Sequence, residues 1–202
     1  MTTENDFKKE NRRKLLSRIA TGNWDAVVLA HSAFSRMPVS LELFQRYMQK
    51  EIDALEQFRR DEADENGKGS KVIKEIEKAI KRLKTKLQRR VEAQKKIADD
   101  TLFWEQLGID HLVVDEADLF KNLFYPTRMT RVAGLPNSDS KRAFDMFMKT
   151  RHIYELNNGR GVTFMSGTPV SNTMAEAFTV QRYLMPDALE AGGMAHFDAW
   201  AR

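Results

Sequence analysis

The chain has 202 residues, 42% hydrophobic and 31% charged, which suits one folded domain with a real core and much exposed helix. It has no cysteine, so disulfides and cysteine-based zinc sites are excluded, and its four histidines show no metal-ligand spacing. No apolar run approaches the ~20 residues of a membrane-spanning helix and no export signal is present, so we expect a cytoplasmic protein without a membrane partner.

The first forty residues predict a basic helix followed by a strand. Apolar residues recur at helical spacing over 6–20, and Gly22 suits the end of a helix. The apolar run at 25–30 favours a buried strand. His31 and Ser32 directly follow this run.

Residues 41–100 predict a long antiparallel helical hairpin. Apolar residues recur every three or four positions over 41–64, Ser40 suits the N-cap, and 66–70 carry a turn signal. A heptad seam then runs through the second arm. Over 71–96 there are eleven basic and three acidic residues, whereas 41–65 hold eight acidic and four basic ones, which favours pairing of the arms.

Three interpretations of this hairpin stay open. It can be a solvated coiled-coil insertion, a basic prong that contacts DNA phosphates, or a surface on which a partner docks. In the DNA interpretation, four basic side chains of the second arm contact the phosphates. They are Lys78, Lys81, Arg82 and Arg89.

Two further apolar runs each stop abruptly at polar residues. With the first run, they predict three parallel strands at about 25–30, 111–115 and 161–166, because unbroken apolar runs suit strands buried on both faces. Helices are expected at about 139–157 and 173–184, with a loop over 127–140. Ligands bind beyond the carboxyl ends of such strands. The polar residues expected together at that edge are Asp115, Glu116, Ser166, Gly167 and Thr168.

The acidic pair suits phosphoryl-transfer chemistry. Asp115 would face a hard cation such as Mg²⁺, which is held through one or two carboxylates together with phosphates and water. Glu116 would orient or deprotonate the attacking water. The alternative is that the acids simply cap a following helix.

The string Asp115-Glu116-Ala117-Asp118 resembles motif II of the superfamily-two helicases and translocases, and Ser166-Gly167-Thr168-Pro169 resembles their motif III. The continuations through Lys121-Asn122 and through Ser171-Asn172 to Glu176 are similar to Swi/Snf-type ATPases, although Asp118 stands where that group more often has His. The Ser-Ala-Thr form of DEAD-box helicases is absent. The resemblance implies Mg²⁺ and ATP as cofactors of the complete motor and duplex DNA, bound without sequence preference, as its partner. It also implies coupling between the two motifs through Asp118, Ser166, Gly167 and Thr168.

Residues 6–40 are similar to the large helicase–adenine-methylase proteins of phages, plasmids and integrative elements. The strings that carry this resemblance are Asn11-Arg12-Arg13, Arg18 to Val28, His31-Ser32-Ala33-Phe34 and Pro38-Val39-Ser40. It implies that His31 and Ser32 lie near a nucleic-acid-facing motif of the first motor lobe, where their imidazole and hydroxyl could contact phosphate oxygens. A strand-end histidine satisfied within the fold is an equally good interpretation of His31.

No Gly-x-x-x-x-Gly-Lys-Ser/Thr phosphate loop occurs in the sequence. The resemblance assigns the arginine finger to a second lobe, for which no residues follow. We therefore expect an α/β fold: a partial RecA-like lobe (1–40 and 101–202) with a small parallel sheet of about three strands flanked by helices, and the hairpin (41–100) as an insertion. Such a fragment would bind no cofactor tightly, would be inactive alone, and would need the remaining lobes as partners. The alternatives are a non-catalytic DNA-binding module and a coiled-coil adaptor.

Overall fold

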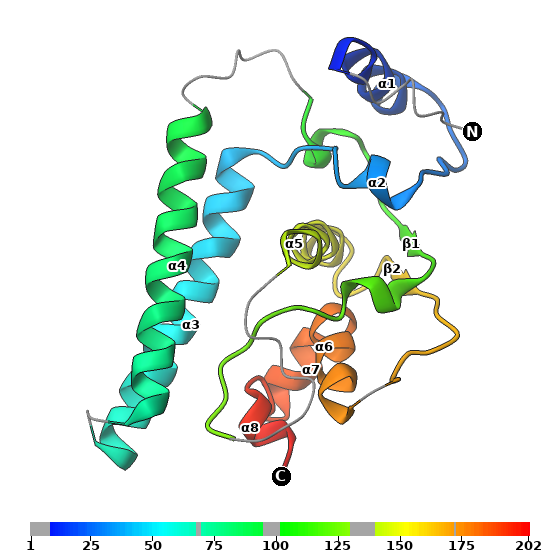
Figure 1. Ribbon diagram of the computed structural model, residues 1–202. Coiled ribbons are helices and arrows are strands. Elements are labelled where there is room, and N and C mark those ends of the chain that lie inside the picture. The colour runs from blue at the N-terminus through cyan, green and yellow to red at the C-terminus, as the bar shows by residue number, and fades with distance from the viewer. Residues whose placement is uncertain (1–8, 68–69, 95–101, 130–139, 172) are drawn as a thin grey trace.

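A computed structural model describes residues 9–67, 70–94, 102–129, 140–171 and 173–202 (Figure 1). The elements in chain order are α1 (Lys9–Thr21), α2 (His31–Phe34), α3 (Leu41–Asn66), α4 (Lys71–Gln94), the short 3₁₀ helix η2 (Trp104–Gln106), β1 (Leu112–Val114), the 3₁₀ helix η3 (Ala117–Phe120), α5 (Lys141–Leu156), β2 (Val162–Phe164), α6 (Met174–Leu184), α7 (Pro186–Ala191) and α8 (Phe197–Trp200). In the part of the chain that the structure describes, no helix is both long and apolar enough to cross a membrane.

The two strands β1 and β2 pair in parallel, as the sequence predicts for the runs at 111–115 and 161–166. Leu112 lies opposite Val162 and Val114 opposite Phe164. The amide of Leu112 donates to Gly161 O at 2.8 Å, and the amide of Met165 donates to Val114 O at 2.8 Å. The small parallel sheet flanked by helices confirms the α/β class.

The predicted strand at 25–30 is not found, because the described residues contain only the two strands β1 and β2. Residues 26–30 are irregular, and Val27 and Leu29 pack partly against the core. A cavity of about 760 Å³, lined by residues 24–29 and by residues 107–115, lies between this segment and β1. An apolar run becomes a strand only where a neighbouring backbone completes its hydrogen bonds. Among the described residues, no strand forms a ladder with this segment.

The predicted hairpin forms and lies along the rest of the molecule (Figure 1). The Ser40 hydroxyl accepts from the Leu43 amide at 3.0 Å as the N-cap of α3, and Gly67 turns the chain with φ of 79°. The seam residues Ile76, Ile80 and Leu83 of α4 are buried in the core that α3 also lines. Residues 95–100 of the predicted insertion lie outside the described residues.

Ion pairs join the hairpin to α6 and to the loop after η3. Arg182 of α6 binds both carboxylate oxygens of Glu51, at 3.2 and 3.3 Å, and Phe124 O at 2.9 Å. Arg128 binds Glu62, whose side chain is 3% exposed, at 2.6 Å. Solvent screens partly buried ion pairs less than exposed ones. These pairs therefore hold the hairpin against the neighbouring elements more firmly than exposed pairs would.

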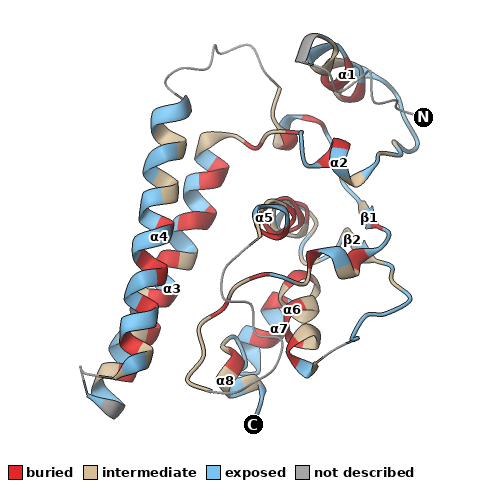
Figure 2. Ribbon diagram, viewed as in Figure 1, coloured by how far each residue is buried: buried red, intermediate tan, exposed pale blue. Residues whose placement is uncertain are grey.

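Helix α5 is the centre of the core (Figure 2). The Ser140 hydroxyl caps it by accepting from the Ala143 amide, and the helix ends near the predicted boundary. Its buried residues cover almost all of its circumference: Ala143, Phe144, Met146, Phe147, Met148, Lys149, Thr150 and Ile153. A helix with buried residues on most of its faces belongs in the interior, even where it carries a polar residue such as Thr150.

One buried charge on α5 holds α2 in place. Lys149 is fully buried and its Nζ donates to Phe34 O at 2.8 Å and to Asp145 Oδ2 at 2.7 Å. Burial lowers the pKa of Lys149 and raises the pKa of Asp145, while their mutual attraction opposes both shifts. The Phe34 carbonyl at the end of α2 therefore has a charged donor from the core.

The last three helices form a second apolar cluster with the loop after η3. Its buried members are Tyr125, Ala175, Phe178, Leu189 and Phe197. Helix α6 ends at Leu184 as predicted, and Pro186 begins α7, where proline is well tolerated at the first helical position.

Candidate functional site at the carboxyl edge of the sheet

Parallel pairing brings the ends of β1 and β2 to one edge of the sheet. Asp115 and Glu116 follow β1 directly, and Ser166 lies two residues beyond β2. The Ala117 amide donates to Met165 O at 3.0 Å, which holds the two chain segments together just past the strands. We call this region the acidic edge and define it by Asp115, Glu116, Asp118 and residues 166–168.

The two acids are exposed at the point where the chain turns sharply. Glu116 adopts a left-handed conformation with φ of 50° and ψ of 45°, and its amide donates to Asp115 Oδ1 at 3.0 Å. This conformation costs a residue with a side chain about 1–2 kcal/mol, so the neighbouring contacts must hold it. The turn allows both carboxylates to reach solvent at the strand end.

The coupling residues of the two motifs contact each other. The Ser166 hydroxyl donates to Asp118 Oδ1 at 3.3 Å and accepts from the Thr168 amide at 3.1 Å. A methyl group at Gly167 would meet nothing within 4 Å, so the loop is open there. One hydroxyl thus links η3 to the loop after β2, and its role in coupling stays a prediction.

Lys121 completes this link, although our sequence reasoning gave it no role in the site. Its Nζ donates to Thr168 O at 2.6 Å, to Ser171 Oγ at 3.3 Å and to Glu176 Oε2 at 3.0 Å. The side chains of Lys121 and Glu176 are only 9% and 12% exposed. The signal was present in the sequence, since both residues belong to the Swi/Snf-like strings, but their contact could not be read from them. Asn172 lies outside the described residues.

His31 and Ser32 lie at the start of α2, beside η3. The His31 ring stands edge-on to the Phe120 ring, with centroids 5.3 Å apart, and Ser32 is exposed. Phe120 ends η3, so α2 is a direct neighbour of the segment that carries the acids. The structure therefore brings these two candidates close to the acidic edge.

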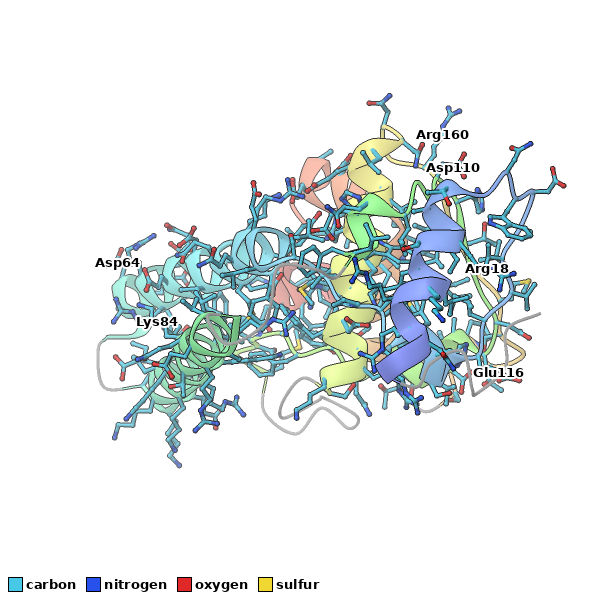
Figure 3. The ribbon with its side chains drawn as sticks, turned by 90° about the horizontal axis from the view of Figure 1, so that it is seen from above. Arg18, Asp64, Lys84, Asp110, Glu116 and Arg160 are labelled. Atoms are coloured by element: carbon cyan, nitrogen blue, oxygen red, sulfur yellow. The ribbon has the colours of Figure 1, made fainter. Side chains whose placement is uncertain are left out.

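The four basic candidates of α4 are not part of that site. In Figure 3 the labelled Lys84 of α4 and Glu116 lie on opposite sides of the molecule. Lys78, Lys81 and Arg89 are exposed, and the Arg82 guanidinium packs 5.6 Å from the centre of the Phe124 ring. Arg82 is thus turned partly toward the lobe.

Comparison with known proteins identifies a helicase-related family. The family described as "Probable helicase domain" matches residues 1–202, and the chain belongs to this family. It is also similar to "Defense against restriction protein B" of Escherichia phage P1, with 30% identity over 86 residues. That match spans 42% of this chain and 4% of the relative. No solved structure matches.

The Lys121 contacts generate a test of the link between the motifs. Replacing Lys121 with Met leaves Glu176 and Thr168 O without their cation, so we expect unfolding free energy to fall by about 1–3 kcal/mol. Amide exchange at Ser171, whose N–H donates to Glu176 Oε2 at 2.7 Å, should become faster. Lys141→Met, at an exposed lysine, is the control. Unchanged exchange at Ser171 in Lys121→Met would show that the link does not order the loop.

Proposed function

We propose that this chain forms part of the first ATPase lobe of a Swi/Snf-type DNA helicase or translocase. The observation that carries the proposal is the acidic edge, where two exposed carboxylates and a motif-III-like hydroxyl lie side by side after neighbouring parallel strands. Membership in the helicase-domain family supports the same conclusion. The phage origin of the relative fits a complete protein carried by a mobile element.

The residues of the acidic edge have suitable chemistry for Mg²⁺ and ATP in the complete motor. Asp115 offers exposed carboxylate oxygens, the donors that Mg²⁺ prefers. When bound, Mg²⁺ would neutralise negative charge on the phosphates of ATP. Glu116 would orient the attacking water and accept its proton. The Ser166–Asp118 contact and Lys121 would hold the motif III loop against that centre.

Two parts of an ATPase site, the phosphate-binding loop and the arginine finger, are expected from the rest of the motor. A phosphate-binding loop and an arginine finger are not provided by the sequence motifs of this chain. We therefore propose that the isolated chain is inactive and that the complete protein supplies both.

A substitution at Glu116 tests the catalytic role in the complete protein. Glu116→Gln removes the base but keeps the size and the exposed position of the side chain, so we expect ATP turnover to fall by about 100-fold or more with nucleotide binding retained. The measurement compares steady-state hydrolysis and nucleotide affinity with those of Glu75→Gln, at an exposed acid of α4. Turnover equal to wild type would refute the role of Glu116.

A second candidate function, DNA binding through α4, has its own support. Lys78, Lys81 and Arg89 are exposed, and none has a side-chain hydrogen bond or ion pair among the described residues.

The structure leaves less support for the coiled-coil adaptor hypothesis. The apolar seam of α4 already packs against α3, so this seam offers little apolar surface to a partner protein.

Salt dependence tests this second candidate on the isolated chain. Replacing Lys78, Lys81 and Arg89 with Gln should weaken binding to duplex DNA and reduce the slope of log affinity against log salt by about one per residue. The control is a triple variant with Gln at three other exposed basic residues, which changes the net charge by the same amount. These residues are Arg36, Lys141 and Arg160. Equal effects of the two triple variants, or no binding by the wild type, would eliminate α4 as the DNA-binding face.

A further inference from the structure

Another cavity lies between the hairpin and the last helices. Its volume is about 290 Å³, close to the lower end of the range of about 300–1,000 Å³ for small-molecule sites. Its walls come from α3, from α5, from residues 125–126 and from residues 182–197. We call this cavity the hairpin pocket. It shares no residue with the acidic edge, so it is a separate candidate site.

Much of the wall of the hairpin pocket is apolar or aromatic. Leu55, Phe147, Leu189 and Phe197 all line it, and all four are buried. Burial and the nearby Glu155 carboxylate raise the pKa of the Tyr47 hydroxyl, which therefore stays neutral. Such walls suit the body of a small organic molecule better than a bare inorganic ion.

Three Lys and Arg side chains line the pocket, and two of them are already paired. Arg182 binds Glu51 at 3.2 Å, and Lys50 binds Glu155 at 3.1 Å. The third is Arg151 of α5, which has no hydrogen bond or ion pair with any residue that the structure describes. The pocket therefore contains one cationic group whose donors are not used by the described fold.

Arg151 is held in a place that is unfavourable for an unpaired charge. Its guanidinium packs 4.9 Å from the centre of the Phe147 ring, and the guanidinium of Arg182 packs 5.4 Å from the same centre. Burial, and then the positive charge of Arg182, lower the pKa of Arg151. A partly desolvated charge without a hydrogen-bonded counter-ion destabilises a fold. An anion bound beside Arg151 would remove this cost.

The other charges of the lining select the kind of anion. Three acids, Glu51, Glu155 and Glu190, also line the pocket. A phosphate ester carries a charge of about −1.5 to −2 at neutral pH and would be repelled by these acids more than a singly charged carboxylate. A planar carboxylate also matches the two parallel N–H donors of a guanidinium.

We propose that the hairpin pocket binds a small carboxylate with an apolar body. The carboxylate pairs with Arg151, and the body lies against the apolar wall that includes Phe147 and Leu189. The proposal goes beyond the proposed ATPase function and does not depend on it, because it uses none of the residues of the acidic edge.

A series of small probes tests the ligand class on the 202-residue chain. Acetate, butyrate and hydrocinnamate carry the same carboxylate on bodies of increasing apolar size. We expect hydrocinnamate to shift the Nε–H NMR signal of Arg151 and to bind about ten-fold or more tightly than acetate, because its body covers the apolar wall. Hydrocinnamyl alcohol, which has no charge, and phenethyl phosphate, which has too much, should each bind about ten-fold or more weakly than hydrocinnamate.

Matched variants separate a binding role of Arg151 from a structural one. Arg151→Met keeps an apolar contact with Phe147 but removes the charge, so it should weaken hydrocinnamate about ten-fold or more. Arg36→Met, at an exposed arginine outside the pocket, should not. Without ligand, Arg151→Met should have a urea midpoint equal to or above that of wild type, whereas Arg182→Met, which removes a paired cation, should have a lower one.

Four results would overturn the proposal. They are no binding by any of the three carboxylates, binding of the alcohol or the phosphate as tight as that of hydrocinnamate, unchanged affinity in Arg151→Met, and a lowered urea midpoint in Arg151→Met. Unchanged ATP turnover in Glu116→Gln would refute the catalytic role of Glu116 and leave these binding results as they are, so the two failures are distinguishable.

Discussion

The parallel pairing of β1 with β2 is the constraint on which the candidate site depends. It places Val114 opposite Phe164, and the next residues of both segments therefore emerge at one edge. The turn at Glu116 and the Ser166–Asp118 hydrogen bond then act over short distances. Without the pairing, the acids and the loop after β2 would be unrelated segments separated by about fifty residues of chain.

The helices were predictable because their signals are local. Ser40 caps α3 as its position before an apolar periodic run predicts, Gly67 turns the hairpin, and α5 begins close to the predicted start at about 139. The strand at 25–30 was predicted wrongly because an apolar run does not reveal whether a neighbouring strand is available. The hydrophobic pattern of a segment indicates its tendency to form a strand. The hydrogen-bond ladder of a sheet also needs a second segment at the right distance.

The contacts that organise the site are long-range and could not be read from the sequence. Lys121 meets Thr168 and Glu176, and Lys149 meets Phe34 O across more than a hundred residues. A lysine next to a polar residue, as in Lys121-Asn122 and Lys149-Thr150, is predicted to lie at the surface until its partners are known. The ion pair between Arg182 and Glu51, which holds the hairpin against α6, is another long-range contact that the sequence does not reveal. The motifs located the candidate site, and these buried cations show how its parts are held.

The register of the two strands is the most direct measurement of this account. The chain has no cysteine, so cysteines introduced at the exposed partners Val113 and Thr163 can be tested for disulfide formation without background. The account predicts rapid crosslinking of this pair, and none for cysteines at Val113 and Val162, since a shift of one residue turns the side chain to the other face. Crosslinking of the shifted pair, or of neither pair, would contradict the shared edge on which the proposed motor site depends.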